Sequence, residues 1–342
     1  MIPVILKYSR TDTSEEISVK VTFKNSIVWK TILVAASVAV MALIAGCTSG
    51  FAEPYDISNI YFNYTTVSGS DGEYIVITKH IASQSDVRIP DTIYGLPVRE
   101  IADSVFAEDE LIESVTFGKN MRVVGSNAFG GCPRLQSVTF NVSMTDIGDY
   151  AFKECASLPS VALPENLQTL GRGAFYNCGS LSDITVPHGI QKVGGRAFGG
   201  TKWLKAKSKK KFVTVGDGIL IAYNGDKADV TLPKSIRQIA GAFAGNTVVK
   251  TVDLNNGLTS VGDMAFMGCT SLIAVRIPVS LNDIGSNAFY GCSAMSQITL
   301  IENIHSIGPD AFTDCSAKLL VRKGSYAERY CAENGLDCFT LK

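Results

Sequence analysis

The chain has 342 residues, of which 46% are hydrophobic and 18% are charged, and its formal net charge is −1. This length is sufficient for one or two globular domains. Residues 47–342 contain 26 basic and 29 acidic residues, which excludes the strongly basic composition that is typical of nucleic-acid-binding domains. We therefore expect no nucleic-acid partner.

An uncharged segment occupies residues 31–46, TILVAASVAVMALIAG, with Lys24 and Lys30 before it and Cys47 after it. A basic flank, a short apolar run and small residues at its end predict an export signal over residues 1–46. The end of this segment, IAGC, resembles a bacterial lipobox. That resemblance implies cleavage before Cys47 and a membrane anchor formed by lipid on this cysteine.

Two features of this segment leave alternatives open. An uncleaved anchor over residues 27–45 would be barely long enough to span a bilayer, and Lys30 interrupts it. The region before the apolar run has 30 residues and carries three acids, whereas such regions are usually short, so a translation start downstream of Met1 is an open alternative. Residues 47–63 are polar with scattered aromatic side chains, and we interpret them as a tether.

A phenylalanine recurs every 23 residues through most of the remaining chain. The period is interrupted once, by a spacing of 45 residues. A fixed period of about 20 to 50 residues indicates a repeat architecture. We assign residues 64–316 to repeats, of which the first is atypical because Asp109 replaces a repeated cysteine. The phenylalanines are Phe106, Phe129, Phe152, Phe175, Phe198, Phe243, Phe266, Phe289 and Phe312.

The repeat at residues 158–180 shows what each unit is expected to form. Val161 and Leu163 share one side of a short strand, because side chains alternate along an extended chain, and Pro164 ends it. A polar link and a glycine turn lead to Phe175, whose apolar neighbours have the spacing of one helical turn. A single unit cannot bury its apolar side, whereas stacked units can. The pattern therefore predicts an α/β repeat solenoid, with a parallel sheet on one face and short helical turns opposite.

The repeated pattern L-x-x-V-x-I-P, followed by V-x-x-I-G-x-x-A-F-x-x-C, resembles the BspA-like family of bacterial leucine-rich repeats. The resemblance extends over roughly residues 65–342. It implies a leucine-rich-repeat solenoid that is often found on cell surfaces and used for binding, and it implies no reaction. One repeat carries the pattern on Leu272, Val275, Ile277, Pro278, Ile284, Gly285, Ala288, Phe289 and Cys292.

Each predicted strand also has one residue that points out of the sheet, between its two inward residues. Most of these are threonines, and charged residues occur toward the C-terminal half. Two interpretations are open: threonine simply suits exposed strand positions, or the whole face is a broad polar binding surface. This candidate binding face consists of Thr116, Thr139, Thr185, Thr231, Asp253, Arg276 and Thr299.

The interruption of the period, at residues 201–228, contains two β-like runs, 212–215 and 219–223, around a Gly-Asp-Gly turn. We expect a β-hairpin island within the solenoid, with Trp203 covering the edge of the core. The same segment concentrates lysines, which form either a solvated face or a patch for an anionic surface such as lipopolysaccharide or an acidic glycan. This candidate lysine patch consists of Lys205, Lys207, Lys209, Lys210 and Lys211.

Six of the nine cysteines lie three residues after a repeat phenylalanine. Stacked in register, they would point in the same direction, so we expect reduced, buried thiols rather than disulfides between units. Metal binding is a poor alternative, because no histidine or second cysteine lies at chelating spacing within a unit. Cys331 and Cys338 are separate and have the spacing to close a loop. The sequence contains no catalytic or nucleotide-binding motif, and we expect neither a metal nor a cofactor.

Residues 317–342 have the pattern of a strand, a helix and a strand, with Ser325 as the N-cap, and we interpret them as a C-terminal cap. The preferred hypothesis is a monomeric, surface-exposed lipoprotein of the bacterial cell envelope. Its solenoid would bind a protein or glycan partner without catalysis. Two rival hypotheses stay open: an envelope enzyme that uses the solenoid as a scaffold, and a passive structural module.

Overall fold

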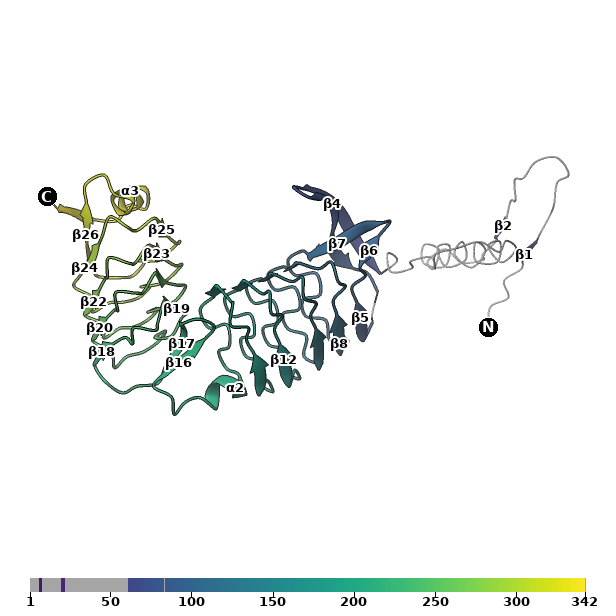
Figure 1. Ribbon diagram of the computed structural model, residues 1–342, viewed down its shortest axis with the longest axis horizontal. Coiled ribbons are helices and arrows are strands. Elements are labelled where there is room, and N and C mark those ends of the chain that lie inside the picture. Colours follow the sequence, from purple (N-terminus) through teal and green to yellow (C-terminus); the bar gives the residue numbers. More distant parts are fainter. Residues whose placement is uncertain (1–5, 8–19, 22–60, 83, 342) are drawn as a thin grey trace. The chain divides into compact units, whose positions relative to one another are not determined.

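The computed structural model describes residues 6–7, 20–21, 61–82 and 84–341, and the chain divides into two units, residues 1–55 and 56–342. In the first unit, β1 (Leu6–Lys7) and β2 (Lys20–Val21) pair antiparallel. The apolar run of the predicted export signal, Cys47 and most of the predicted tether lie outside the described residues. The second unit is a solenoid in which each 23-residue repeat forms one coil (Figure 1).

Each coil begins with a three- or four-residue strand. In β12 (Ser160–Ala162), Val161 is buried between two exposed neighbours, and Leu163 directly after the strand is buried as well. This is the alternation that the sequence predicts. Equivalent strands pair parallel and in register, with Val138 beside Val115 in the neighbouring coil. These first strands are β5 (Asp86–Arg88), β8 (Ser114–Thr116), β10 (Ser137–Thr139), β14 (Asp183–Thr185), β18 (Asp229–Thr231), β20 (Thr251–Asp253), β22 (Ala274–Arg276) and β24 (Gln297–Leu300).

A second strand, two residues long in most coils, follows at the position where the sequence predicts a polar link and a turn. In β13 (Thr169–Leu170), Leu170 is fully buried and pairs with Ile147 and Val193 of the adjacent coils. The solenoid therefore has a second parallel ladder. Its other strands are β7 (Leu96–Ile101), β9 (Val123–Val124), β11 (Asp146–Ile147), β15 (Lys192–Val193), β19 (Gln238–Ile239), β21 (Ser260–Val261), β23 (Asp283–Ile284) and β25 (Ser306–Ile307).

The third side of each coil is a series of turns. Backbone amides alternate in direction: the N–H of Ala128 bonds within its own coil to Gly125, whereas that of Phe129 bonds to Ala151 of the next coil, at 2.8 Å. Asn127 has a positive φ of 55°, a conformation that asparagine tolerates better than most residues. The apolar residues that are spaced three and four apart in the sequence thus lie in turns that are hydrogen-bonded to the next coil, and not in an α-helix. Within the described residues, α-helix is confined to α2 (Lys202–Lys205) and α3 (Tyr326–Glu333).

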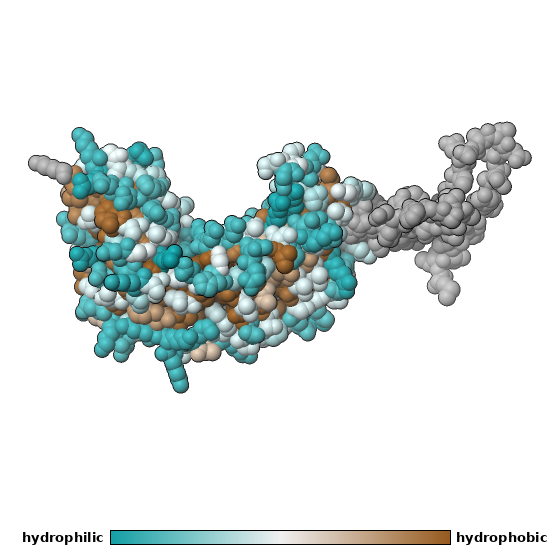
Figure 2. Space-filling model, in the orientation of Figure 1, coloured by the Kyte–Doolittle hydropathy of each residue, from teal (hydrophilic) through white to brown (hydrophobic). Residues whose placement is uncertain are grey.

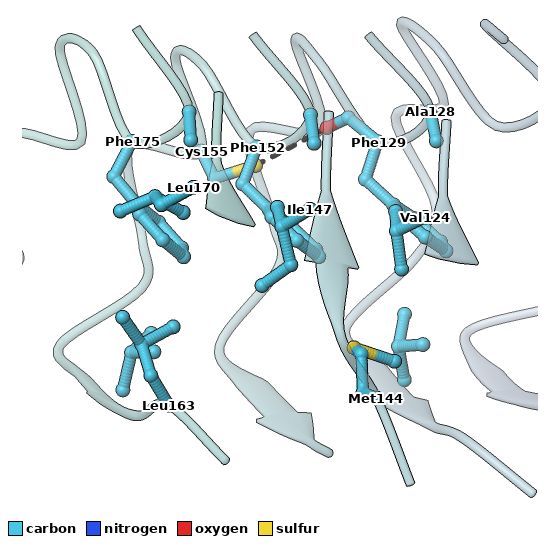
Figure 3. Packing of buried hydrophobic residues seen from close by; sticks show 14 of the residues in the cluster. Val124, Ala128, Phe129, Met144, Ile147, Phe152, Cys155, Leu163, Leu170 and Phe175 are labelled. Atoms are coloured by element: carbon cyan, nitrogen blue, oxygen red, sulfur yellow. Dashed lines mark hydrogen bonds between the residues drawn. The ribbon is translucent and has the colours of Figure 1, made fainter. Parts of the chain in front are cut away.

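The repeat phenylalanines form the predicted buried stack (Figure 3). The ring centroids of Phe129 and Phe152 are 5.3 Å apart, and those of Phe152 and Phe175 are 5.4 Å apart, with interplanar angles of 2° and 5°. These distances lie within the range of about 4.5–7 Å that is typical of interacting aromatic pairs. Because each ring inside a stack has a phenylalanine above and below it, one side-chain type suits successive coils.

All six ladder cysteines are free thiols, and five of them are buried in this core and donate a hydrogen bond; Cys315, in the last coil, is only half-buried. The thiol of Cys155, for example, donates to the carbonyl of Phe129 in the preceding coil, at 3.2 Å (Figure 3). Burial raises the pKa of Cys132 to about 12, and does the same for Cys269. The thiols therefore stay protonated and keep their role as donors. Cys331 and Cys338 are free thiols too.

Antiparallel hairpins begin the two stacks of coils. β3 (Phe62–Gly69) and β4 (Gly72–His80) precede the first stack, and β4 pairs parallel with β7. β16 (Phe212–Val215) and β17 (Ile219–Tyr223) form the predicted hairpin, and β17 pairs parallel with β19. The second hairpin is therefore not an excursion from the solenoid, because its second strand is a rung of the second ladder (Figure 1).

β17 separates two hydrophobic cores. Its side chains Ile219 and Ile221 belong to the core of the first stack, whereas Leu220 and Tyr223 belong to that of the second. Tyr223 ends the strand and packs on Phe243, with centroids 4.9 Å apart. Each hairpin thus supplies the ring on which a phenylalanine stack begins.

Three exceptions to the cysteine ladder fall at the ends of the stacks. The first coils carry Asp109 and Asn246 at this position, and both side chains accept hydrogen bonds from backbone amides two and three residues later. No repeat phenylalanine of the same stack precedes these coils, so the carbonyl to which a ladder cysteine donates is missing there. Thr201 ends the first stack and caps α2 by accepting from the N–H of Leu204, at 3.1 Å.

The remaining elements close the ends of the solenoid. β6 (Thr92–Ile93) pairs with β7, and the last coil leads to β26 (Lys318–Arg322), α3 and β27 (Cys338–Leu341). Ser325 caps α3 as expected, accepting from the N–H of Glu328 at 3.2 Å. None of the helices in the described part of the chain has the length and apolar content that crossing a bilayer requires.

Candidate interaction surface

All seven residues of the candidate binding face are exposed. Backbone register places Asp253 between Thr231 and Arg276, and it places Thr139 beside Thr116. The first strands form four hydrogen-bonded ladders, so backbone register is defined within each of them: β5-β8-β10, β12-β14, β18-β20-β22 and β24-β26-β27. Within each ladder, the structure therefore offers a row of outward side chains on this side.

The row in the second stack is the one that carries charge. Asp253 and Arg276 are neighbours in register, yet neither forms an ion pair or a side-chain hydrogen bond within the described residues. The residues two positions earlier in the same strands behave differently. The hydroxyl of Thr251 donates a hydrogen bond to the carboxylate of Asp229 in the adjacent coil, at 2.5 Å. The column that contains Asp229 and Thr251 thus stabilises the stack, while the column that contains Asp253 and Arg276 is available to a partner.

The second ladder presents a polar surface that the sequence analysis missed. Its outward positions include Ser260 and Asp283, whose side chains hydrogen-bond at 2.7 Å. In the first stack, Arg99 and Arg122 from successive coils both bond to Asp71. The hydrogen bond from Arg99 is the main reason why the pKa of Asp71 is lowered. The sequence contains a sign of this polar surface, because the residue before the Ile-Gly pair of the repeat pattern is polar in most repeats.

A groove of about 610 Å³ lies where the second ladder is interrupted, between β15 and β17. Charges of both signs line it: Lys192 comes from β15, Arg237 precedes β19, and Asp217 lies in the hairpin turn. Arg237 and Asp217 form an ion pair at 3.2 Å, and both side chains are well exposed. Mixed, solvent-exposed charge suits a polar partner better than a small apolar ligand, which prefers an enclosed cleft.

A second groove, of about 360 Å³, lies beside β16, and we call it the hairpin groove. It combines apolar side chains with lysines and a length of strand backbone. Ile184 and Val186 contribute from the last coil of the first stack. The other lining residues are Trp203, Lys207, Lys210, Phe212, Val213, Thr214, Val215 and Gly216.

Two lysines of the candidate patch, Lys207 and Lys210, line this groove. Trp203 is only 9% exposed and covers the edge of the core as predicted, with the ammonium group of Lys207 4.2 Å from its ring centroid. Lys211 lies in the same way over Phe212, at 5.2 Å. The remaining three, Lys205, Lys209 and Lys210, are exposed. Hydrophilic side chains accordingly project from the surface beside α2 (Figure 2).

A histidine with a buried side chain lies inside the first stack. The side chain of His80 is 6% exposed, and its Nδ1 lies 3.7 Å from Asp109 Oδ2. Burial lowers the pKa of His80, and Asp109 offsets part of that effect. The ring packs on Phe106 at a centroid distance of 4.8 Å, so it takes the place that Tyr223 has in the second stack. In the described residues, no three His, Cys, Asp or Glu side chains are placed to hold a metal ion.

Three solved structures are among those to which this chain is similar. The solved leucine-rich repeat protein of T. pallidum is 24% identical, with a TM-score of 0.42, covering 72% of this chain and 91% of that one. A leucine-rich cell surface protein from Faecalibacterium prausnitzii is 20% identical, with a TM-score of 0.31, covering 86% and 100%. The pneumococcal vaccine antigen PcpA is 16% identical, with a TM-score of 0.36, covering 82% and 97%.

Among curated proteins, the chain has no match. The family described as the BspA type leucine rich repeat region matches residues 99–221 and 222–327, with 6 copies of the repeat. The boundary between the two matched segments falls within β17, where the structure changes from the first core to the second. Because the match covers more than half of the chain, and the repeats have the expected stacked coils, the protein belongs to the BspA-type leucine-rich repeat family.

Proposed function

We propose that this protein is a lipoprotein of the bacterial cell envelope whose solenoid binds a protein or glycan partner at the cell surface. Its membership of a leucine-rich repeat family supports a binding role, because repeat solenoids offer extended surfaces built on rigid backbone. The sequence of residues 31–47 supports export and a lipid anchor on Cys47. We assign the protein no reaction and no cofactor, and we expect it to act as a monomer.

One observation carries the binding role. Thr231, Asp253 and Arg276 stand in register on three paired strands, exposed and without partners among the described residues. Strand spacing of about 4.8 Å per coil holds their backbone positions, so a partner meets an arrangement that is already organised. A carboxylate next to a guanidinium group can accept and donate charge-assisted hydrogen bonds, which suits polar groups on a protein or a glycan.

The lipid anchor is tested by metabolic labelling of cells that make the full chain, using a fatty-acid analogue. We expect the wild-type protein to be labelled and the Cys47→Ala variant to be unlabelled. The same cells, intact, are then tested against arrays of extracellular proteins and glycans. Saturable binding that needs the repeat protein supports the proposed role, whereas binding to neither array favours a passive structural module.

A further inference from the structure

Two strands beside the turn of the second hairpin have an edge without a paired strand among the described residues: β16 of the hairpin itself, and β14 of the last coil before it. Within the described residues, β16 pairs only with β17, and β14 pairs only with β12. An open edge presents unpaired backbone N–H and C=O groups, which another strand can satisfy. The four residues of β16 provide roughly 13 Å of edge, at about 3.3 Å per residue. This is enough for a short segment of a partner strand.

The hairpin groove lies between these two edges. Residues 212–216 line it on one side, and Ile184 and Val186, at and just after β14, line it on the other. Val213 and Val215 are buried, whereas Thr214 between them is exposed. The groove therefore combines strand backbone with apolar walls, and an added strand could place alternate side chains against those walls.

The lysines around this groove make its charge positive, and their backbone is held in place. Residues 202–211 contain six lysines, and none of them forms an ion pair with a described residue. The side chain of Asn224 donates to the carbonyls of Lys207 and Lys210, at 3.3 and 2.9 Å. These bonds hold the lysine-bearing loop against the end of the hairpin, so Lys207 and Lys210 stay at the rim of the groove.

We propose that the hairpin groove binds an extended acidic peptide, which pairs with the open edge of β16 and places carboxylates on Lys207 and Lys210. Backbone pairing would give the affinity, and the pockets and charges would give the specificity, as in other cases of strand addition. A glycan would meet the lysines but lacks the alternating amide groups that match a strand edge. Lysines beside an open edge also repel a second copy of this chain, but they attract an acidic strand.

This site is distinct from the row of Thr231, Asp253 and Arg276, so it goes beyond the proposed function and can fail separately from it. The probe is a fluorescent ten-residue peptide of alternating glutamate and valine, titrated by anisotropy with the full chain. We expect saturable binding that weakens as salt rises, because exposed charges are screened. The Lys207→Gln/Lys210→Gln double variant should bind at least tenfold more weakly. Lys234→Gln/Lys250→Gln, which changes two exposed lysines outside the patch, should bind like the wild type.

Backbone pairing is tested by changing the peptide and leaving the protein intact. N-methylation of alternate amides removes strand donors without altering side chains or charge, and we expect it to weaken binding at least tenfold. A lysine–valine peptide of the same length should not bind. Equal binding of the methylated and unmethylated acidic peptides would overturn strand addition and leave a simple anionic-surface patch. No binding of the acidic peptide at low salt, with circular dichroism showing folded protein, would also overturn it.

Discussion

At the scale of single residues, the fold depends on a few side chains that every coil repeats. Phe175 is fully buried and stacks between Phe152 and Phe198. Truncation leaves a cavity that the parallel rings on either side cannot easily fill. We expect Phe175→Ala to lower the free energy of unfolding by about 3–5 kcal/mol, the usual range for a buried aromatic residue, as measured by chemical denaturation. A change within experimental error would contradict the stacked core.

The ladder cysteines give a second test at this scale. Burial raises the pKa of Cys132 and Cys269 to about 12, well above the ordinary value of 9.0. The stability that comes from the neutral thiols is complete below pH 9 and is lost as the pH rises toward 12. We therefore expect the five hydrogen-bonded ladder cysteines to resist alkylation in the native protein at pH 8.5 and to react after denaturation. Mass spectrometry counts the labels, and rapid native labelling of all five would rule out the buried ladder.

Burial of these residues could be predicted from the sequence, since a constant period places equivalent side chains in equivalent environments. The turn geometry could not be predicted in the same way. Apolar residues three and four apart, such as Ala174, Phe175 and Cys178, fit one face of a helical turn and equally fit turns that exchange hydrogen bonds with the next coil. The choice depends on bonds between coils, such as that from Phe129 to Ala151, which no single repeat contains.

At the scale of elements, the hairpins start the stacks, and the first hairpin contains a histidine, His80, whose pKa is lowered by burial. Because burial lowers the pKa of His80 below its ordinary 6.5, the unfolded chain binds a proton more readily than the folded one. Stability from neutral His80 is complete above pH 6.5 and declines as the pH falls below that value.

We expect the loss of stability between pH 7.5 and 5.5 to be smaller in His80→Phe than in the wild type. Phenylalanine continues the ring stack on Phe106 but does not titrate. His188→Gln is the matched control, since that histidine is exposed, and it should keep the wild-type dependence. Denaturant midpoints at both pH values measure the effect. An unchanged dependence in His80→Phe would assign the titration to other groups.

β17 gives a prediction about how the two stacks are coupled. Leu220 is buried in the second core and Ile221 in the first, so truncating each should affect a different stack. We expect Leu220→Ala to speed amide exchange in β19 and β21 more than in β13 and β15, and Ile221→Ala to have the opposite preference. Equal effects of both variants on both stacks would show that the cores open as one unit.

The sequence predicts the hairpin well because its two runs and the Gly-Asp-Gly turn are local. Its role as a rung could not be predicted, since the pairing of Leu220 with Ile239 joins segments whose spacing departs from the repeat. The second ladder was missed for a related reason. Most of its strands have only two residues, such as Thr169–Leu170 with one buried side chain, so alternation is too short to distinguish a strand from a turn.

At the scale of the whole molecule, the candidate surfaces follow from where the ladders continue and where they stop. Alternation within a strand was enough to predict that Asp253 and Arg276 point outward. The two grooves beside the second hairpin could not be predicted, because they exist only where β14 and β15 fail to pair with the hairpin. The sequence showed a cluster of lysines but not that two of them, Lys207 and Lys210, line a groove beside the open edge of β16.

The most direct test of the binding role compares affinities for a partner identified with intact cells, measured at several salt concentrations. Three full-length proteins are compared: the wild type, Asp253→Ala/Arg276→Ala, and Lys209→Ala/Lys210→Ala/Lys211→Ala. All the changed positions are exposed, so each variant should remain folded. We predict that the Asp253/Arg276 variant loses the most affinity for this partner, by about tenfold or more if two charge-assisted contacts are removed. The opposite ranking, with binding that fades steeply as salt rises, would contradict this account and place the main partner at the lysine patch.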